Sequence, residues 1–211
     1  MSKIKKIHVF ISTGVIIAAI LGWAFIESAK PLPGELIADL GRGHVAEGSK
    51  IDYNSNPPTS GPHYEVWTKP GVYSEPQDDR NLVHSLEHGY IIISYNCDKK
   101  ISSFRLIPQA KAHGIEDKVN EATSSATEAT SSAVLSLNFR SKECHDLVDK
   151  LISIYEKKGK RKIIITPRPN LDTQIALTAW GRMDKFDQFD ENRVGVFIDK
   201  LRDKGPEQTM E

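Results

Sequence analysis

The sequence has no excess of either charge. Its 211 residues include 28 Lys and Arg against 28 Asp and Glu, which gives a formal net charge of zero. Proteins that bind nucleic acid commonly carry a basic face that neutralises phosphates. Because this footprint is missing, we expect no nucleic-acid partner. The length is sufficient for one ordinary domain with appendages, and 39% hydrophobic residues are enough to build a core.

Formal charge is also missing from residues 7–26, apart from His8 when its ring is protonated. A helix needs about 20 apolar residues to cross the hydrocarbon core of a bilayer. Three lysines precede this segment, at positions 3, 5 and 6, and fewer charges follow it closely. The positive-inside rule then places the N-terminus in the cytoplasm. We therefore predict a cytoplasmic tail over 1–6 and a single-pass transmembrane anchor over 7–26.

A cleaved signal peptide is the alternative interpretation of the same segment. Signal peptidases prefer small residues at positions −3 and −1 of the cut site. A cut after Ala29 would put Glu27 at position −3, so an uncleaved anchor is favoured. In either case the rest of the chain is exported, to the periplasm or the cell exterior. Residues 27–43 contain prolines and glycines typical of a linker, and 44–207 form the exported domain.

Regular periodicity is absent from residues 44–79, which are rich in Pro, Gly and Asn. Four aromatic residues fall in this stretch, Tyr53, Tyr64, Trp67 and Tyr73. That aromatic content is too high for a disordered tether. We predict an ordered, loop-rich segment with short strands.

Clear periodicity follows after residue 88. Continuous β-branched runs predict buried strands, and apolar residues at i, i+3 and i+4 predict amphipathic helices. The predicted strands are 89–95, 162–166 and 175–180, and the predicted helices are 141–158 and 191–204. A strand–helix–strand unit joins parallel strands by a right-handed crossover, and a short turn should make the third strand antiparallel to the second. The fold class is therefore α+β, a mixed sheet with two helices on one face and residues 44–88 on the other.

A tandem repeat interrupts this pattern between the first strand and the first helix. "EATSSAT" at 121–127 is followed directly by "EATSSAV" at 128–134. A helix made of these residues would present only Ala and Thr on any face, so it could bury little apolar surface. We predict a low-complexity surface insertion over 100–140 and assign it no function.

The sequence has two cysteines, and each flanks the predicted insertion. Cys97 follows the first strand and Cys144 lies in the first turn of the next helix. In an exported protein an even pair placed in this way predicts a disulfide. A metal site formed by Cys144 and His145 is the alternative. Adjacent residues of a helix point about 100° apart, which makes them poor joint ligands.

The segment "LVHSLEHGYIII" carries the densest polar cluster, His84-x-x-Glu87-His88. In a helical turn His84 and His88 share one face, as two metal ligands would. His63, which follows three prolines in "NPPTSGPHY", offers a third imidazole. Glu87 would then orient a ligand histidine or act as a base. The alternative is that these rings only donate to neighbouring carbonyls at the start of a strand.

Several motifs together resemble a widespread bacterial family of membrane-anchored domains of unknown function. These motifs are "YNSNPPTSGPHY", "GVY", "LVHSLEHGYIIISY", "LTAWGR" and "GPE". The resemblance covers about 44–207 apart from 98–140. It implies an N-terminal transmembrane helix followed by one extracytoplasmic domain, and a shared site at His63, His84, Glu87 and His88. It brings no established activity.

Three functions are compatible with these residues. The first is a membrane-tethered protein that binds zinc or copper through His63, His84 and His88. The second is a module that binds an envelope glycan or peptide on the aromatics of 44–88, or an envelope scaffold with partners that the sequence does not identify. The third is a metal-dependent hydrolase with Glu87 as base. His-x-x-Glu-His is also an inverzincin peptidase signature, but Gly89 and the apolar run after it should end the helix too early.

Overall fold

We analysed a computed structural model, which describes residues 13–23, 31–99, 135–207 and 209. The chain divides into two units, Met1–Pro33 and Gly34–Glu211. In the first unit, residues 13–23 are helical. No helix within the described part of the chain is both long and apolar enough to span a bilayer. The predicted tail over 1–6 lies outside the described residues, as do both ends of the predicted anchor over 7–26.

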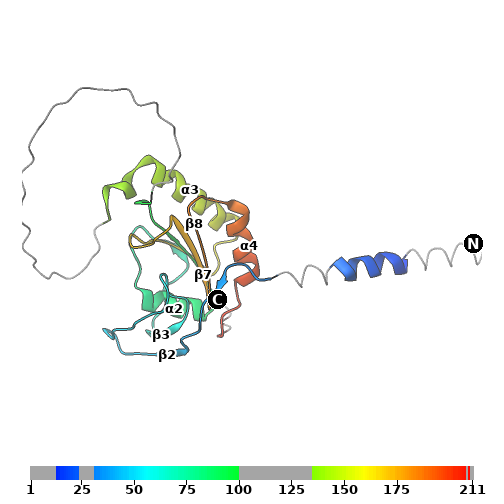
Figure 1. Cartoon of the computed structure of the whole chain (residues 1–211), viewed down its shortest axis with the longest axis horizontal. Helices are drawn as coiled ribbons and strands as arrows, with labels where there is room; N and C mark the ends of the chain where they lie inside the picture. The colour runs from blue at the N-terminus through cyan, green and yellow to red at the C-terminus, as the bar shows by residue number, and fades with distance from the viewer. Residues whose placement is uncertain (1–12, 24–30, 100–134, 208, 210–211) are drawn as a thin grey trace, which may run out of the picture. The chain divides into compact units, whose positions relative to one another are not determined.

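The second unit is built on a mixed sheet of six strands, ordered β1-β8-β7-β5-β6-β4. Strand β5 lies at its centre, parallel to β6 and antiparallel to β7. Figure 1 shows β7 and β8 crossing the middle of this unit. The strands are β1 (Glu35–Leu36), β4 (Gly71–Val72), β5 (Ile91–Tyr95), β6 (Ile163–Pro167), β7 (Ile175–Ala179) and β8 (Arg182–Phe186). The predicted α+β class with a mixed sheet is confirmed.

Helices cover both faces of the sheet. Helices α3 (Lys142–Lys157) and α4 (Glu191–Leu201) bury their apolar stripes against Ile91 and Ile93 on one face. Helix α2 (Asp79–Glu87) covers the other face, where Leu86 packs with Ile92. Alternate residues of β5 point to opposite faces, so one strand supplies both cores. Two predicted helices therefore lie on one face and the 44–88 segment on the other, as expected.

The strand order adds what the sequence did not predict. Strand β7 runs antiparallel to β6, as predicted, but it pairs with β5 and leaves the other edge of β6 to β4. Strand β8 was not predicted, although it pairs with β7 along its whole length. Its sequence, "RMDKF", alternates charged and apolar residues too briefly to stand out from a loop, and its half-buried position explains that composition.

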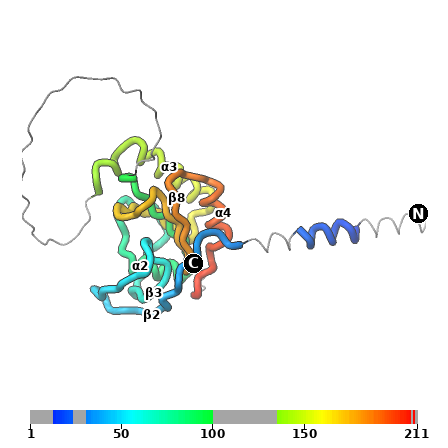
Figure 2. The backbone as a smooth tube through the Cα atoms, viewed as in Figure 1, coloured from blue at the N-terminus to red at the C-terminus, as the bar shows by residue number. Residues whose placement is uncertain are grey.

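The predicted linker over 27–43 is wrong for its second half. Residues from Gly34 onward belong to the domain, since β1 pairs with β8 and β2 (Arg42–His44) pairs in parallel with β3 (Gly61–His63). Strands of two or three residues have no readable period, so only their tertiary partners define them. Figure 2 shows β2 and β3 next to α2.

The two cysteines meet as predicted. Cys97 and Cys144 form a disulfide, with their Cα atoms 5.5 Å apart. Residues 100–134 of the predicted insertion lie outside the described residues. The stretch after them is part of the fold, because a 3-10 helix at Leu137–Arg140 buries Phe139 in the core beside the disulfide. The predicted insertion over 100–140 is therefore too long at its C-terminal end.

Candidate functional site

The His-x-x-Glu-His motif occupies the last turn of α2. Asp78 caps the helix at its start, and the helix ends at Glu87 with His88 as the C-cap. Gly89 follows with a φ of +80°, and a Cβ there would lie 2.8 Å from the Cα of Asp203. Glycine is therefore required for the sharp turn into β5. The helix stops at the second histidine, which does not fit the continuing helix of an inverzincin peptidase.

His84 and His88 face each other, as expected from their spacing. Their Nε2 atoms are 3.1 Å apart. His84 Nδ1 lies 2.7 Å from the carbonyl oxygen of Tyr64. A carbonyl only accepts, so Nδ1 donates and Nε2 of the neutral ring keeps its lone pair. His84 can thus offer one ligand atom, Nε2.

His63 approaches the same point from β3. Its ring is fully buried, and Nδ1 donates to the carbonyl of Gly61 at 2.8 Å. Its Nε2 lies 2.8 Å from Glu87 Oε2 but makes no hydrogen bond. Two buried electron-rich atoms at this distance repel each other unless a proton or a metal cation lies between them. Glu87 thus contacts His63.

His44 joins this cluster although the sequence analysis did not single it out. It is the register partner of His63 in the β2–β3 pair, and the two ring centroids lie 5.2 Å apart. The His44 ring is also 5.0 Å from that of His84. A lone histidine at the start of the loop-rich 44–88 segment carries no signal in the sequence, and only the pairing of β2 with β3 brings it here.

The candidate ligands form two sets that share His84. In each set every residue offers one ligand atom within 4.8 Å of the others. The inner set is His44, His63, His84 and Glu87, and the outer set is His84, His88 and Glu207. The predicted trio of His63, His84 and His88 is therefore brought together around His84, but His63 and His88 fall in different sets.

Glu207 reaches the site because the C-terminal segment folds back over the end of α2 (Figure 2). The backbone N–H of Glu207 donates to the carbonyl of Glu87 at 3.0 Å. Gly205 is packed so closely that a Cβ would lie 2.2 Å from that same carbonyl oxygen. Buried Lys162 donates from Nζ to the carbonyls of His88 at 2.9 Å and Thr209 at 2.6 Å. The sequence motif "GPE" therefore has a structural role beside the histidines.

A protein family matches most of the second unit. The family model described as "Protein of unknown function (DUF3105)" matches residues 44–117 and 132–211. The chain belongs to the DUF3105 family. No curated protein and no solved structure gave a match. The unmatched stretch, 118–131, contains most of the tandem repeat.

Burial favours the neutral form of one histidine in this DUF3105 domain, His84. Burial lowers the pKa of His84 below its ordinary value. The hydrogen bond to the Tyr64 carbonyl partly opposes this shift, and the nearby rings of His63, His88 and His44 add to it. The neutral ring is therefore favoured, and neutral imidazole is the form that binds metals.

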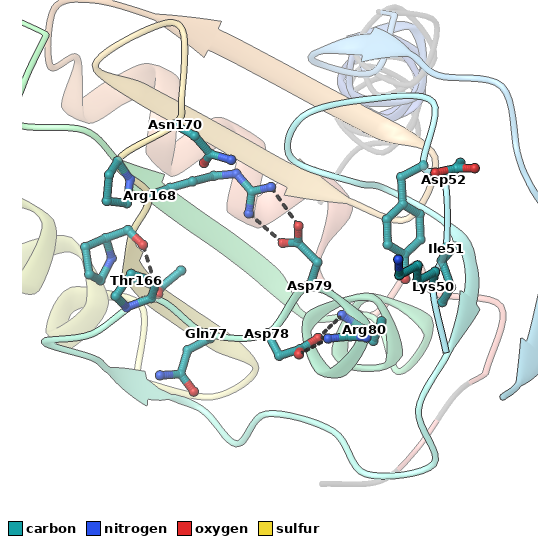
Figure 3. Close-up of a pocket in the computed structure, with 14 residues that line it drawn as sticks. Lys50, Ile51, Asp52, Gln77, Asp78, Asp79, Arg80, Thr166, Arg168 and Asn170 are labelled. Carbon is teal, nitrogen blue, oxygen red and sulfur yellow. Dashed lines mark hydrogen bonds and ion pairs between the residues drawn. The ribbon is translucent and has the colours of Figure 1, made fainter. Parts of the chain in front are cut away.

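A pocket of about 630 Å³ lies between residues 50–53, the start of α2 and the end of β6. Figure 3 shows Arg168 turned toward Asp79 and Arg80 turned toward Asp78. Arg168 donates to both carboxylate oxygens of Asp79, at 2.5 and 2.8 Å, and Arg80 pairs with Asp78. Burial and the Asp79 carboxylate raise the pKa of Tyr53, which lines the same pocket. Because both arginines are paired within the domain, we assign this pocket no ligand.

The aromatic residues of 44–88 fasten the loops to the domain. Trp67 and Tyr73 pack against the core beneath α2. The hydroxyl of Tyr53 donates to the carbonyl of Pro62 at 2.8 Å, and that of Tyr64 accepts from the N–H of Gly48 at 2.7 Å. These contacts account for the aromatics without an external ligand.

Proposed function

We propose that this DUF3105 protein binds one transition-metal ion, zinc or copper, through the inner set of His44, His63, His84 and Glu87. The observation that carries the proposal is the contact between His63 Nε2 and Glu87 Oε2, 2.8 Å apart and without a hydrogen bond. Two ligand atoms of one tetrahedral zinc lie roughly 3.4 Å apart for bonds of about 2.1 Å. The two atoms are thus close enough to bind one ion, which would remove their repulsion.

The nature of the ligands favours particular metals. Three imidazoles and one carboxylate suit zinc and Cu²⁺, whereas Cu⁺ prefers thiolate and thioether ligands. Both cysteines of the chain are held in the disulfide, so neither supplies a thiolate. Glu87 is buried with its side chain 7% exposed, and the partly exposed Arg42 lies 3.8 Å from its other oxygen. The carboxylate therefore serves as a ligand, and we propose no catalytic role for it.

We further propose that the protein is anchored in a membrane by residues 7–26, with the domain outside the cytoplasm. The lysines before the segment support this orientation. The disulfide also favours an oxidising compartment. An alkaline phosphatase fused after Glu211 tests the proposal, because this reporter is active only when exported. An inactive fusion to a stably expressed chain would contradict it.

The metal proposal is tested by elemental analysis of the full chain, purified without a histidine tag and dialysed against metal-free buffer. We expect about one zinc or copper per chain. His63→Ala and Glu87→Gln should each remove most of the metal, while circular dichroism stays unchanged. His145→Ala is the matched control, because His145 is exposed on α3 and belongs to neither set.

Two results would contradict the metal proposal. The first is a wild-type chain that holds no metal after reconstitution with Zn²⁺ and with Cu²⁺. The second is retention of the metal by both inner-set variants. In either case the histidines would have a structural role, donating to the carbonyls of Gly61 and Tyr64 as they do here.

A further inference from the structure

The two ligand sets cannot both be complete at the same time. They share His84, and its Nδ1 is occupied by the carbonyl of Tyr64 at 2.7 Å. Only Nε2 remains, and one imidazole nitrogen binds one metal ion. An ion on this nitrogen therefore completes its shell from the inner set or from the outer set. Because His88 Nε2 is only 3.1 Å away, the two alternatives are next to each other.

The two sets differ in the number and burial of their ligands. The inner set has four members, of which His63, His84 and Glu87 are buried. The outer set has three, and its carboxylate, Glu207, has a side chain that is 53% exposed. Glu207 Oε2 lies 3.6 Å from His88 Nε2. More ligands and less water favour the inner set for tight binding, whereas the outer set is open to an incoming molecule.

We propose that His84 is a pivot ligand, and that a metal ion passes between the inner set and the outer set while it stays bound to His84 Nε2. This inference depends on the metal-binding function proposed above. The metal ion enters and leaves the protein while it is bound to the outer set. During this exchange, a ligand of the metal donor or acceptor replaces Glu207. The donor is a metal chelate and the acceptor is a metal-free chelator, and each exchanges the ion by direct ligand exchange. The protein then acts as a metal carrier.

The backbone around Glu207 is built to hold this carboxylate in place. Its N–H is bonded to the carbonyl of Glu87, and Gly205 allows the close approach that this bond requires. Lys162 is 1% exposed and ties Thr209, beyond Glu207, to His88. These bonds fix the backbone but leave the side chain of Glu207 half in solvent. A fixed backbone keeps the Glu207 carboxylate near His88, and its exposed side chain lets it release the metal ion to another molecule.

The test measures zinc transfer from the full chain, loaded with one Zn²⁺, to a chromogenic zinc chelator in stopped flow. Glu207→Gln keeps the size and the backbone bond but weakens the ligand. We expect this variant to keep the bound zinc and its equilibrium affinity, and to slow transfer on the order of tenfold. Glu156→Gln is the control, since Glu156 is exposed on α3 and paired with Lys160; its transfer rate should equal that of the wild type.

The outcomes separate this inference from the proposed function. An unchanged transfer rate in Glu207→Gln, with one zinc bound, would overturn the pivot and leave the metal site intact. Loss of the bound zinc in Glu207→Gln would also overturn it, because Glu207 would then belong to the resting site. Two zinc ions per chain would show that the sets fill together, which excludes a shared pivot. A wild-type chain that binds no zinc and no copper would instead reject the proposed function itself.

Discussion

His63 Nε2 and Glu87 Oε2 lie 2.8 Å apart, one at the end of strand β3 and the other at the end of helix α2. Neither element is long, and each is held by the other parts of the domain. The N–H of Val45 donates to the carbonyl of His63 at 2.8 Å, and the N–H of Glu207 donates to that of Glu87 at 3.0 Å. The backbone thus fixes two side chains that would otherwise move apart.

Metal should therefore stabilise the folded chain. A ligand present at 100 times its dissociation constant stabilises by about 2.7 kcal/mol, which raises the Tm of a domain of this size by about 5–10 °C. Glu87→Gln should abolish most of this shift and should leave the Tm of the metal-free protein within a few degrees of wild type. Differential scanning fluorimetry with Zn²⁺, and again after chelation, checks both expectations. An equal metal-dependent shift in the variant would exclude Glu87 as a ligand.

Two glycine substitutions should have opposite effects on stability. A Cβ at Gly205 would lie 2.2 Å from the carbonyl oxygen of Glu87 and 2.3 Å from the nitrogen of Gly89. Gly205→Ala must push the C-terminal segment off α2, and we expect a loss of about 2–3 kcal/mol. Gly195 lies in α4, where a Cβ would meet nothing closer than 3.6 Å. Gly195→Ala should stabilise by roughly 0.5–1 kcal/mol. Urea unfolding measures both, and a neutral Gly205→Ala would refute the close packing.

Asp203 should contribute a pH-dependent part of the stability. The Arg161 guanidinium, followed by Lys162, lowers the pKa of Asp203 to about 2 in the folded chain. Because the folded pKa lies below that of the unfolded chain, ionised Asp203 stabilises the fold above about pH 4, and this contribution is lost as the pH falls toward 2. The side chain is 43% exposed, so the effect should be no more than about 1 kcal/mol.

The comparison of wild type with Asp203→Asn isolates this contribution. Asparagine tolerates the φ of +63° at this position as well as aspartate does. We expect the variant to be less stable at pH 6 and equal in stability near pH 2. A difference between the two proteins that does not change with pH would assign the effect to packing.

The disulfide should be oxidised in the mature protein. Thiol alkylation under denaturing conditions should label neither Cys97 nor Cys144 unless a reductant is added first. With a sequence separation of 47 residues, closing the loop stabilises the fold by about 4 kcal/mol on the chain-entropy model. Cys97→Ala with Cys144→Ala should therefore lower the Tm by roughly 8–16 °C. Complete labelling without reductant would show that the cysteines are free thiols.

Removal of residues 118–131 should be tolerated. The family model skips these residues, and their sequence is dominated by Glu, Ala, Thr and Ser with no apolar period. Loop-closure entropy changes slowly with length, so we expect the Tm to change by less than about 4 °C. Thermal unfolding of the deletion variant measures this. A larger fall would mean that the repeat contributes to the core.

Much of the fold could be predicted from the sequence because its central elements have strong local signals. The runs "YIIISY" and "KIIIT" are too apolar for an exposed position, and both became central strands with every residue of β5 and β6 buried. The apolar spacing predicts helices α3 and α4, and in the structure Ser141 and Asp190 cap their starts. The disulfide followed from its place beside the insertion.

The residues of the candidate site likewise fall into those that the sequence predicts and those that only the tertiary structure brings together. By itself the sequence determined that His84 and His88 share a helical face, because a spacing of four residues is a local geometric constraint, and it marked His63 and Glu87 through their motifs. Only the tertiary structure decided that His44 and Glu207 join them. Those two residues come from a three-residue strand and from a segment after the last helix, and no local pattern predicts where such short, irregular segments pack. The same reason explains the strand order: pairing of β7 with β5 depends on which sheet edge is free, a property of the assembled fold.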